Sequence, residues 1–135
     1  MQPKEIVNKM LSNDAFSKWL GVQVEKVEEG YCKISMTIKE DMLNGFGIAH
    51  GGIAYSLADS ALAFASNSRG KHAVTVTTSI HKIEKINKGD KLVAIAKETS
   101  AKNTLGFYKV NIKRGKTVVA MFKGTVYRTD KIWKI

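Results

Sequence analysis

The N-terminal part of the chain has the hydrophobic spacing of two short helices. Its first apolar residues recur at helical intervals: Ile6, Val7, Met10 and Leu11. Pro3 stands where the first turn of a helix tolerates proline. Residues 12–14 interrupt the pattern and resemble an N-cap, after which a second apolar face follows: Phe16, Trp19 and Leu20. The pattern predicts a pair of short N-terminal helices.

Alternating polar and apolar residues predict β-strands in most of the remaining chain. In chain order the predicted strands cover residues 22–24, 32–38, 73–86, 92–96, 108–112 and 118–127. Turn residues separate several of them, at Glu29-Gly30, at residues 87–90 and at Arg114-Gly115. Between Ile80 and Ile83 the alternation slips, which predicts a β-bulge. We therefore expect one antiparallel sheet of about five or six strands, near the usual size.

Residues 53–66 have the pattern of a helix without a polar face. The polar residues in this stretch are small, and Asp59 is the one charge among them. A helix that is apolar around its whole circumference is surrounded by protein on nearly all sides. The pattern predicts an α+β architecture in which a curved antiparallel sheet wraps around one long central helix, with the short N-terminal helices beside it.

Length and cysteine content favour a single intracellular domain. The chain has 135 residues, 44% of them hydrophobic, and we treat residues 1–135 as one domain. Cys32 is the one cysteine, so no internal disulfide can form, and no zinc-type ligand spacing accompanies it. The first residues lack a secretory pattern, and no apolar run approaches the roughly 20 residues that cross a bilayer. We expect a cytoplasmic protein with no metal and no membrane partner.

A formal net charge of +10 makes polyanions possible partners. Nucleic acid, anionic lipid and phosphorylated small molecules would all be attracted to such a surface. The lysines, however, are spread singly along the predicted strands, and the aromatic residues mostly occupy core-facing positions. A nucleic-acid-binding sheet exposes aromatic residues among basic ones. We therefore predict no nucleic-acid partner and interpret the lysines as a solvated surface.

Asp59 is the first candidate for chemistry. Its helical neighbours offer no cation, and a carboxylate is almost never fully buried without a partner. We expect it to line a cleft, where poor hydration raises its pKa and makes it a better base. A surface charge, or one half of a structural ion pair, is the alternative interpretation.

Gly51 and Gly52 stand where the predicted helix begins. A helix N-terminus presents unpaired N–H groups and the positive end of the helix dipole, and glycine lets a ligand oxygen approach them. Such a site suits a developing oxyanion, although two glycines before a helix are also common turn residues. Asp59 lies about 12 Å along the helix from Gly51. Both reach one substrate only if an antiparallel second copy brings Asp59 of one chain near Gly51 of the other.

Four segments together resemble a known family. They are NGFGIAHGG at residues 44–52, SLADSALAFASNSRG at residues 56–70, Gly89-Asp90, and FKGTVYR at residues 122–128. Their order and spacing resemble the hotdog-fold acyl-CoA thioesterases of the phenylacetate-degradation, or PaaI-like, type, from about residue 13 to residue 128. The resemblance implies a homodimer, paired into a homotetramer, that hydrolyses an acyl-CoA thioester. It implies no cofactor, since coenzyme A is part of the substrate.

The resemblance also implies roles for four residues. Asp59 would be the nucleophile, or the general base that activates water. The Gly51 N–H would polarise the thioester carbonyl, with help from the helix dipole. Asn44 would orient the substrate or the water, and Thr75 would hold the attacking water. These four are the predicted catalytic residues.

His50 and Gly52 are the predicted substrate-binding residues, in the loop that enters the helix. Two segments depart from the family pattern. Relatives often carry Arg-Pro where this chain has Glu84-Lys85, and Gly-Arg-Thr-Gly where residues 103–106 read Asn-Thr-Leu-Gly. Because these loops often lie near the coenzyme A nucleotide or the acyl tunnel, the resemblance leaves the acyl group and the phosphate contacts open.

Two other functions of the same fold are alternatives. A non-catalytic module would bind an acyl-CoA in the same cleft, but it has no need of an acid such as Asp59 in an apolar wall. A hotdog hydratase would need an Asp and a His placed to move a proton beside an enoyl group. The arrangement of Asn44, residues 50–52 and Asp59 is not that pattern.

Overall fold

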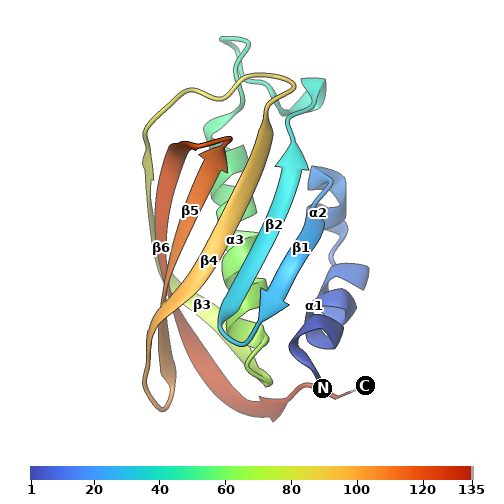
Figure 1. Ribbon diagram of the computed structural model, residues 1–135, viewed down its shortest axis with the longest axis vertical. Coiled ribbons are helices and arrows are strands. Elements are labelled where there is room, and N and C mark those ends of the chain that lie inside the picture. The colour runs from blue at the N-terminus through green and yellow to red at the C-terminus, as the bar shows by residue number, and fades with distance from the viewer. Residues whose placement is uncertain (135) are drawn as a thin grey trace.

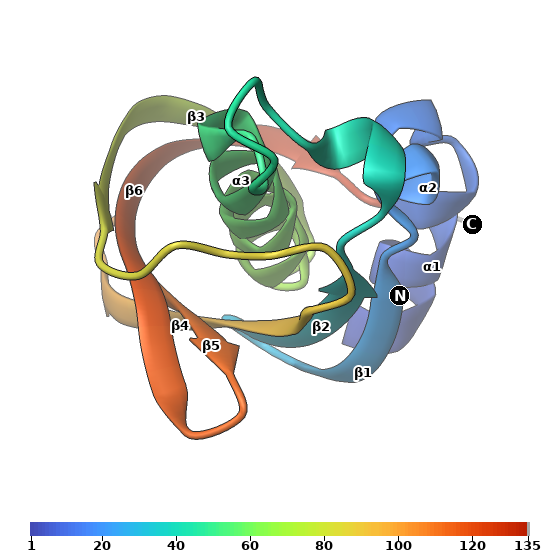
Figure 2. The ribbon, with the colours of Figure 1, turned by 90° about the horizontal axis from the view of Figure 1, so that it is seen from above.

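One long helix lies in the hollow of a curved antiparallel sheet, as Figures 1 and 2 show in two views. The computed structural model describes residues 1–134. The helices are α1 (Pro3–Ser12), α2 (Ala15–Leu20) and α3 (Gly51–Asn67), with a 3-10 turn at Glu40–Met42. The strands are β1 (Gln23–Glu28), β2 (Tyr31–Thr37), β3 (Lys71–Lys82), β4 (Lys91–Ala101), β5 (Leu105–Arg114) and β6 (Thr117–Ile132). They pair in the order β1-β2-β4-β5-β6-β3, always antiparallel.

The core lies between α3 and the concave face of the sheet. Leu57, Ala61 and Leu62 of α3 are fully buried. A side chain at Gly124 of β6 would collide with Leu62, so glycine at this position lets the helix pack directly on the strand. On the strands, burial alternates residue by residue, as in β5 from Leu105 to Ile112, because successive side chains point to opposite faces. The predicted α+β architecture is confirmed.

The N-terminal helices are also confirmed, and they close the open side of the sheet. Helix α1 packs against α3 and β1, where Figure 1 shows it beside the outer strand. The Asp14 side chain caps α2 by accepting a hydrogen bond from the Ser17 N–H at 2.9 Å. Ser17 Oγ in turn lies 2.8 Å from Ser60 Oγ of α3. No helix of the described chain is long and apolar enough to cross a membrane.

The prediction of one strand over residues 73–86 is wrong at its end. Strand β3 ends at Lys82, and its bulges lie between Lys71 and Ala73 and between Thr75 and Thr77, not between Ile80 and Ile83. The next residues form a loop that crosses the end of the sheet, with the Ile83 N–H donating to Val119 O at 2.9 Å. Its Ile83 and Ile86 continue the apolar spacing without continuing the strand, which is why alternation alone misplaced the boundary.

The periodicity predicted that protein surrounds α3 on nearly all sides. Within one chain this prediction is wrong. One stripe of the helix keeps solvent exposure: Gly52, Tyr55, Ser56, Asp59 and Ala63. Tyr55 reaches β3, where its hydroxyl lies 2.7 Å from Thr78 Oγ1. Strand β3 pairs with β6 alone among the described strands, and its Val74 and Val76 are 55% and 54% exposed. Small residues hid the stripe from the sequence pattern, because they are compatible with burial and with exposure.

One expectation about the surface is wrong. Several aromatic side chains lie on the surface rather than in the core: Phe16, Trp19, Phe46, Tyr55, Phe107 and Tyr127. Lys97, Lys109 and Lys123 are exposed and stand singly along their own strands, and the register sets them directly opposite one another on β4, β5 and β6. Strand pairing, which a linear pattern does not contain, aligns the three lysines.

Candidate active site

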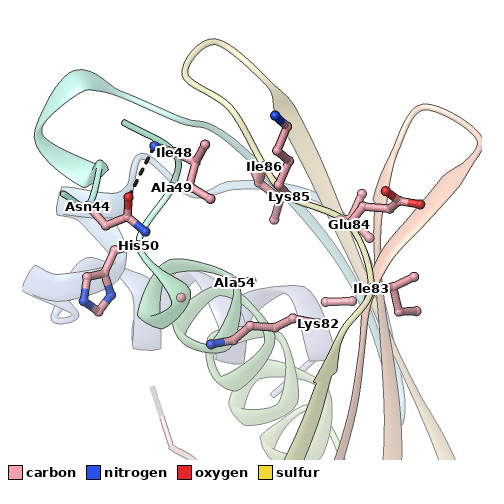
Figure 3. A pocket seen from close by; sticks show the side chains of 13 residues that line it. Asn44, Ile48, Ala49, His50, Ala54, Lys82, Ile83, Glu84, Lys85 and Ile86 are labelled. Carbon is pink, nitrogen blue, oxygen red and sulfur yellow. Dashed lines mark hydrogen bonds between the residues drawn. The ribbon is translucent and has the colours of Figure 1, made fainter. Parts of the chain in front are cut away.

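A cavity of about 310 Å³ opens beside the N-terminus of α3 (Figure 3). Three segments line it, together with Ala54 of α3: the loop that leads from Asn44 to Gly51, residues 82–86 at and after the end of β3, and residues 119–120 of β6. The loops are joined where the Ala49 N–H donates to Ile86 O at 2.8 Å. Segments far apart in the sequence therefore form one wall around the first turn of the helix.

His50 caps α3 and leaves one free amide at its end. Its Nδ1 accepts a hydrogen bond from the Gly52 N–H at 2.9 Å, and its carbonyl accepts from the Ile53 N–H at 2.9 Å. Because a ring nitrogen that accepts a hydrogen bond carries no proton, this contact selects the neutral ring with its proton on Nε2. The Gly52 amide is thus occupied by the cap. The Gly51 N–H has no hydrogen-bond partner among the described residues.

Asn44 has its oxygen committed to the loop and its nitrogen free. The side-chain Oδ1 accepts from the Phe46 N–H at 2.9 Å and from the Ile48 N–H at 3.4 Å; Figure 3 marks the second of these contacts. The backbone N–H donates to Ile48 O at 2.8 Å. Since Oδ1 is occupied, Nδ2 is left without a partner within residues 1–134, and it can donate to a ligand in the cavity that Asn44 lines.

Asp59 lies two turns further along α3 and does not line this cavity. The side chain is half-buried and forms no hydrogen bond or ion pair with the described chain. Burial raises the pKa of Asp59 above its usual value, and the nearby Asp14 carboxylate raises this pKa further. The predicted direction of the shift is confirmed. The helical rise separates Asp59 from Gly51 by about 12 Å.

Thr75 is exposed on β3, beside the bulge that ends at Thr77, and does not line the cavity either. Of the predicted site residues, one chain brings together Asn44, His50 and Gly51 around the cavity. Asp59 faces the open stripe of α3 instead.

Sequence reasoning missed Lys82, which lines the cavity at the end of β3. In the sequence it stands inside a run predicted to be strand up to residue 86, where a lysine indicates only a solvated face. The residue gains a special position because the strand ends at Lys82 and the chain turns across the cavity. No motif signals this turn.

Other candidates for chemistry are excluded or absent within the described chain. Cys32 is buried, and burial raises the pKa of its thiol to about 12. The thiol is therefore protonated near neutral pH and is no nucleophile there. Within residues 1–134, no group of three or more His, Cys, Asp or Glu side chains is placed to hold a metal ion.

The family model of the thioesterase superfamily matches residues 46–121, more than half of the chain. The chain belongs to the thioesterase superfamily. The matched residues of this superfamily member include all of α3 and β3. They also include the whole of two segments that line the cavity, residues 82–86 and 119–120, and most of the loop that enters α3.

Two relatives extend the match to nearly the whole chain. A proposed esterase of Archaeoglobus fulgidus is 40% identical over 123 residues, which are 90% of this chain and 80% of that protein. The acyl-coenzyme A thioesterase PaaI of Escherichia coli is 37% identical over 120 residues, 88% of this chain and 86% of that protein. The resemblance to PaaI-like thioesterases is confirmed.

Solved structures agree with this assignment. The structure of Escherichia coli PaaI superposes with a TM-score of 0.93 at 34% identity and covers 96% of this chain and 95% of that chain. A Streptococcus mutans protein bound to acetyl-CoA superposes with a TM-score of 0.80 at 26% identity, covering 83% of this chain and 91% of that chain. The predicted hotdog fold of this thioesterase-superfamily member is confirmed.

Proposed function

We propose that this protein hydrolyses the thioester bond of an acyl-CoA, releasing a free acid and coenzyme A, at a site shared by two subunits. Membership of the thioesterase superfamily and the similarity to PaaI support the reaction. One observation supports a shared site. The unpaired, poorly hydrated carboxylate of Asp59 and the free N-terminus at Gly51 lie on the same helix, too far apart to act on one carbonyl.

A homodimer, as the family resemblance implies, resolves this separation. The outer edge of β3 has unpaired backbone groups and exposed valines, and such an edge is suited to pair with a second strand. Antiparallel pairing of β3 with the β3 of a second copy would continue the sheet and cover the open stripe of α3. Asp59 of one subunit would then face Gly51 of its partner, and pairing of two dimers would give the homotetramer.

The proposed reaction adds water to the thioester carbonyl. The Gly51 N–H and the positive end of the α3 dipole polarise the carbonyl oxygen, and Asn44 Nδ2 orients the substrate or the water. Asp59 takes a proton from water as the water oxygen bonds to the carbonyl carbon, and the carbonyl electron pair moves to oxygen. When that pair returns, the C–S bond breaks, and the coenzyme A thiolate takes the proton from Asp59.

A second route uses Asp59 as the nucleophile. Its carboxylate oxygen bonds to the carbonyl carbon and expels the thiolate, and water then hydrolyses the resulting anhydride to the free acid and a protonated Asp59, whose proton passes to the thiolate. In either route Thr75, on the β3 edge, is the residue we assign to hold the attacking water. A pKa raised toward neutrality makes Asp59 a stronger base than an ordinary carboxylate.

A panel of acyl-CoA substrates, with thiol release as the readout, tests this function. The wild-type protein should hydrolyse at least one aromatic, short-chain or long-chain member of the panel. Asp59→Asn should slow that turnover by about 10³-fold or more, with an unchanged fold by circular dichroism. Asp130→Asn is the matched control, because Asp130 is exposed at the far end of β6. Thiol release from no substrate, or near-normal turnover by Asp59→Asn, would overturn the proposal.

A further inference from the structure

The side chain of Lys82 lies against the first residue of α3. Figure 3 shows it running from the end of β3 toward the first turn of the helix, whereas Glu84 and Lys85 point away from that turn. A Cβ atom at Gly51 would collide with Lys82 Nζ, and it would lie 3.3 Å from Cε and 3.9 Å from Cδ. The outer half of the lysine side chain therefore occupies the space that any side chain at position 51 would need.

Lys82 is an exposed residue, and the dipole of α3 disfavours a cation at the position of its ammonium group. The helix N-terminus carries the positive end of the dipole, where anions are stabilised and cations are destabilised. Within the described chain, Lys82 has no carboxylate within ion-pair distance and no hydrogen bond from Nζ. Two positive features, the Gly51 amide and the Lys82 ammonium, therefore converge on one wall of the cavity. Glu84 also lines the cavity, but its carboxylate points away from the first turn of the helix.

The two donors are close enough to share one acceptor. A Cβ atom lies about 2.5 Å from the amide nitrogen of its own residue, so Nζ lies within roughly 5 Å of the Gly51 nitrogen. Two donors that bind the same oxygen at about 2.9 Å each are separated by up to roughly 5 Å. An oxygen held by the Gly51 N–H can thus also accept a hydrogen bond from Lys82.

We propose that Lys82 is a further catalytic residue, whose ammonium is the second donor, beside the Gly51 amide, to the thioester carbonyl oxygen. This inference rests on the proposed function. As water adds to the carbonyl carbon, the carbonyl electron pair moves to oxygen, and Lys82 stabilises the resulting negative charge. When the C–S bond breaks, the pair returns to the carbonyl. Lys82 stays protonated throughout, and Asp59 carries the proton from water to the leaving thiolate.

The role predicts a larger effect on turnover than on binding. Charge on the oxygen is greatest in the transition state, so a donor to it lowers the activation barrier more than it strengthens substrate binding. Loss of a single oxyanion donor typically lowers kcat by about 10²–10³-fold. If Lys82 instead bound a carboxylate in the acyl group or a phosphate of coenzyme A, its replacement would raise KM, or it would slow the hydrolysis of one substrate alone.

Three variants of Lys82 and one matched control test the proposal. Lys82→Met removes the charge and keeps the length, Lys82→Gln keeps a neutral donor, and Lys82→Arg keeps the charge. Lys109→Met removes a lysine from the outer face of β5, away from the cavity. kcat and KM are measured by thiol release on butyryl-CoA and succinyl-CoA, which match in chain length and differ in a terminal carboxylate. Thermal unfolding of every variant separates misfolding from a loss of chemistry.

Lys82→Met should lower kcat about 10²–10³-fold on both substrates, with KM changed by less than about threefold. The kcat of Lys82→Arg should be at least about tenfold higher than that of Lys82→Met, and the kcat of Lys109→Met should match that of the wild type. An unchanged kcat, a change confined to KM, or a loss on succinyl-CoA alone would overturn the proposal while leaving the hydrolysis intact. If the wild-type protein hydrolyses neither substrate nor any other acyl-CoA, the proposed function fails and this inference fails with it.

Discussion

The two ends of α3 are both polar, but their polar groups are paired very differently. At the C-terminal end, Asn67 donates to the carbonyls of Ala63 and Ala73 at 2.8 Å and 3.1 Å, and its Oδ1 accepts from Ala73 N–H and Trp133 Nε1. At the N-terminal end, the Gly51 amide and Lys82 have no partner within residues 1–134. The Asn67 network is fully paired, which is typical of a structural role. The donors at the N-terminal end are accessible from the cavity and are therefore available to a ligand.

A cluster of charges reinforces the C-terminal end. Glu98 of β4 contacts both Arg69, which follows α3, and Arg128 of β6, whose Nη1 lies 3.7 Å from Glu98 Oε1. The Tyr108 hydroxyl donates to the same carboxylate at 3.3 Å. Burial and the Glu98 charge raise the pKa of Tyr108. Glu98 and Arg128 are only 11% and 10% exposed, so each depends on the other to be buried as an ion.

The largest expected effect on stability is the loss of the charge at the structural end. Glu98→Gln keeps the size of the side chain but leaves Arg128 buried without a negative partner. We expect the free energy of unfolding to fall by about 3 kcal/mol, the lower end of the range for such losses, because Arg69 can turn toward solvent. Urea unfolding measures the change, with the exposed Glu25→Gln of β1 as control. A loss below about 1 kcal/mol would show that the cluster is not essential to this end.

Asn67→Ala is expected to have the next largest effect. It removes both donors and the acceptor, and it leaves the Ala73 amide and Trp133 Nε1 without their partner. The expected decrease is about 2 kcal/mol, within the usual cost of unpaired buried groups. Thermal unfolding measures it, and kcat of the folded protein should not change. A folded variant with reduced kcat would contradict the division between the two ends.

Asn44 tests the opposite end with two matched variants. Asn44→Ala removes the Oδ1 acceptor of the loop as well as the free Nδ2, so we expect a loss of about 1 kcal/mol in stability and a roughly 10–100-fold lower turnover. Asn44→Asp keeps the acceptor and removes the donor, and it also adds a negative charge to the wall of the cavity. It should retain the stability of the loop and still lose turnover. Unchanged turnover in both variants would remove Asn44 from the reaction.

The two ends also differ in how far the sequence predicts them. The sheet, α3 and the position of Gly51 at its start follow from local periodicity and from the quoted motifs. The raised pKa of Asp59 was predicted because its apolar helical neighbours indicated poor hydration, and burial is its main cause. The cluster around Glu98 could not be predicted from the sequence, because its members lie on separate elements that strand register brings together. Lys82 escaped prediction for a related reason, since its position depends on where β3 ends.

The smallest effect concerns Asp59 and concerns stability rather than activity. Because burial and the Asp14 carboxylate raise the pKa of Asp59, the folded chain binds this proton more tightly than the unfolded chain. The ionised carboxylate therefore lowers the free energy of unfolding at pH values above its raised pKa. This penalty decreases as the pH falls through the raised pKa, and it is lost below the ordinary value of 3.8.

Asp59→Asn should therefore be more stable than the wild type at pH 7, and the difference should vanish at about pH 3. Urea unfolding of both proteins at the two pH values measures it. An Asp59→Asn variant less stable at pH 7 would mean that the carboxylate has a stabilising partner, which would place Asp59 with Glu98 among the structural charges. A more stable and inactive variant would show that the two carboxylates contribute to the free energy of unfolding in opposite directions. Glu98 raises it because Glu98 is paired, and Asp59 lowers it because the partner of Asp59 is the substrate.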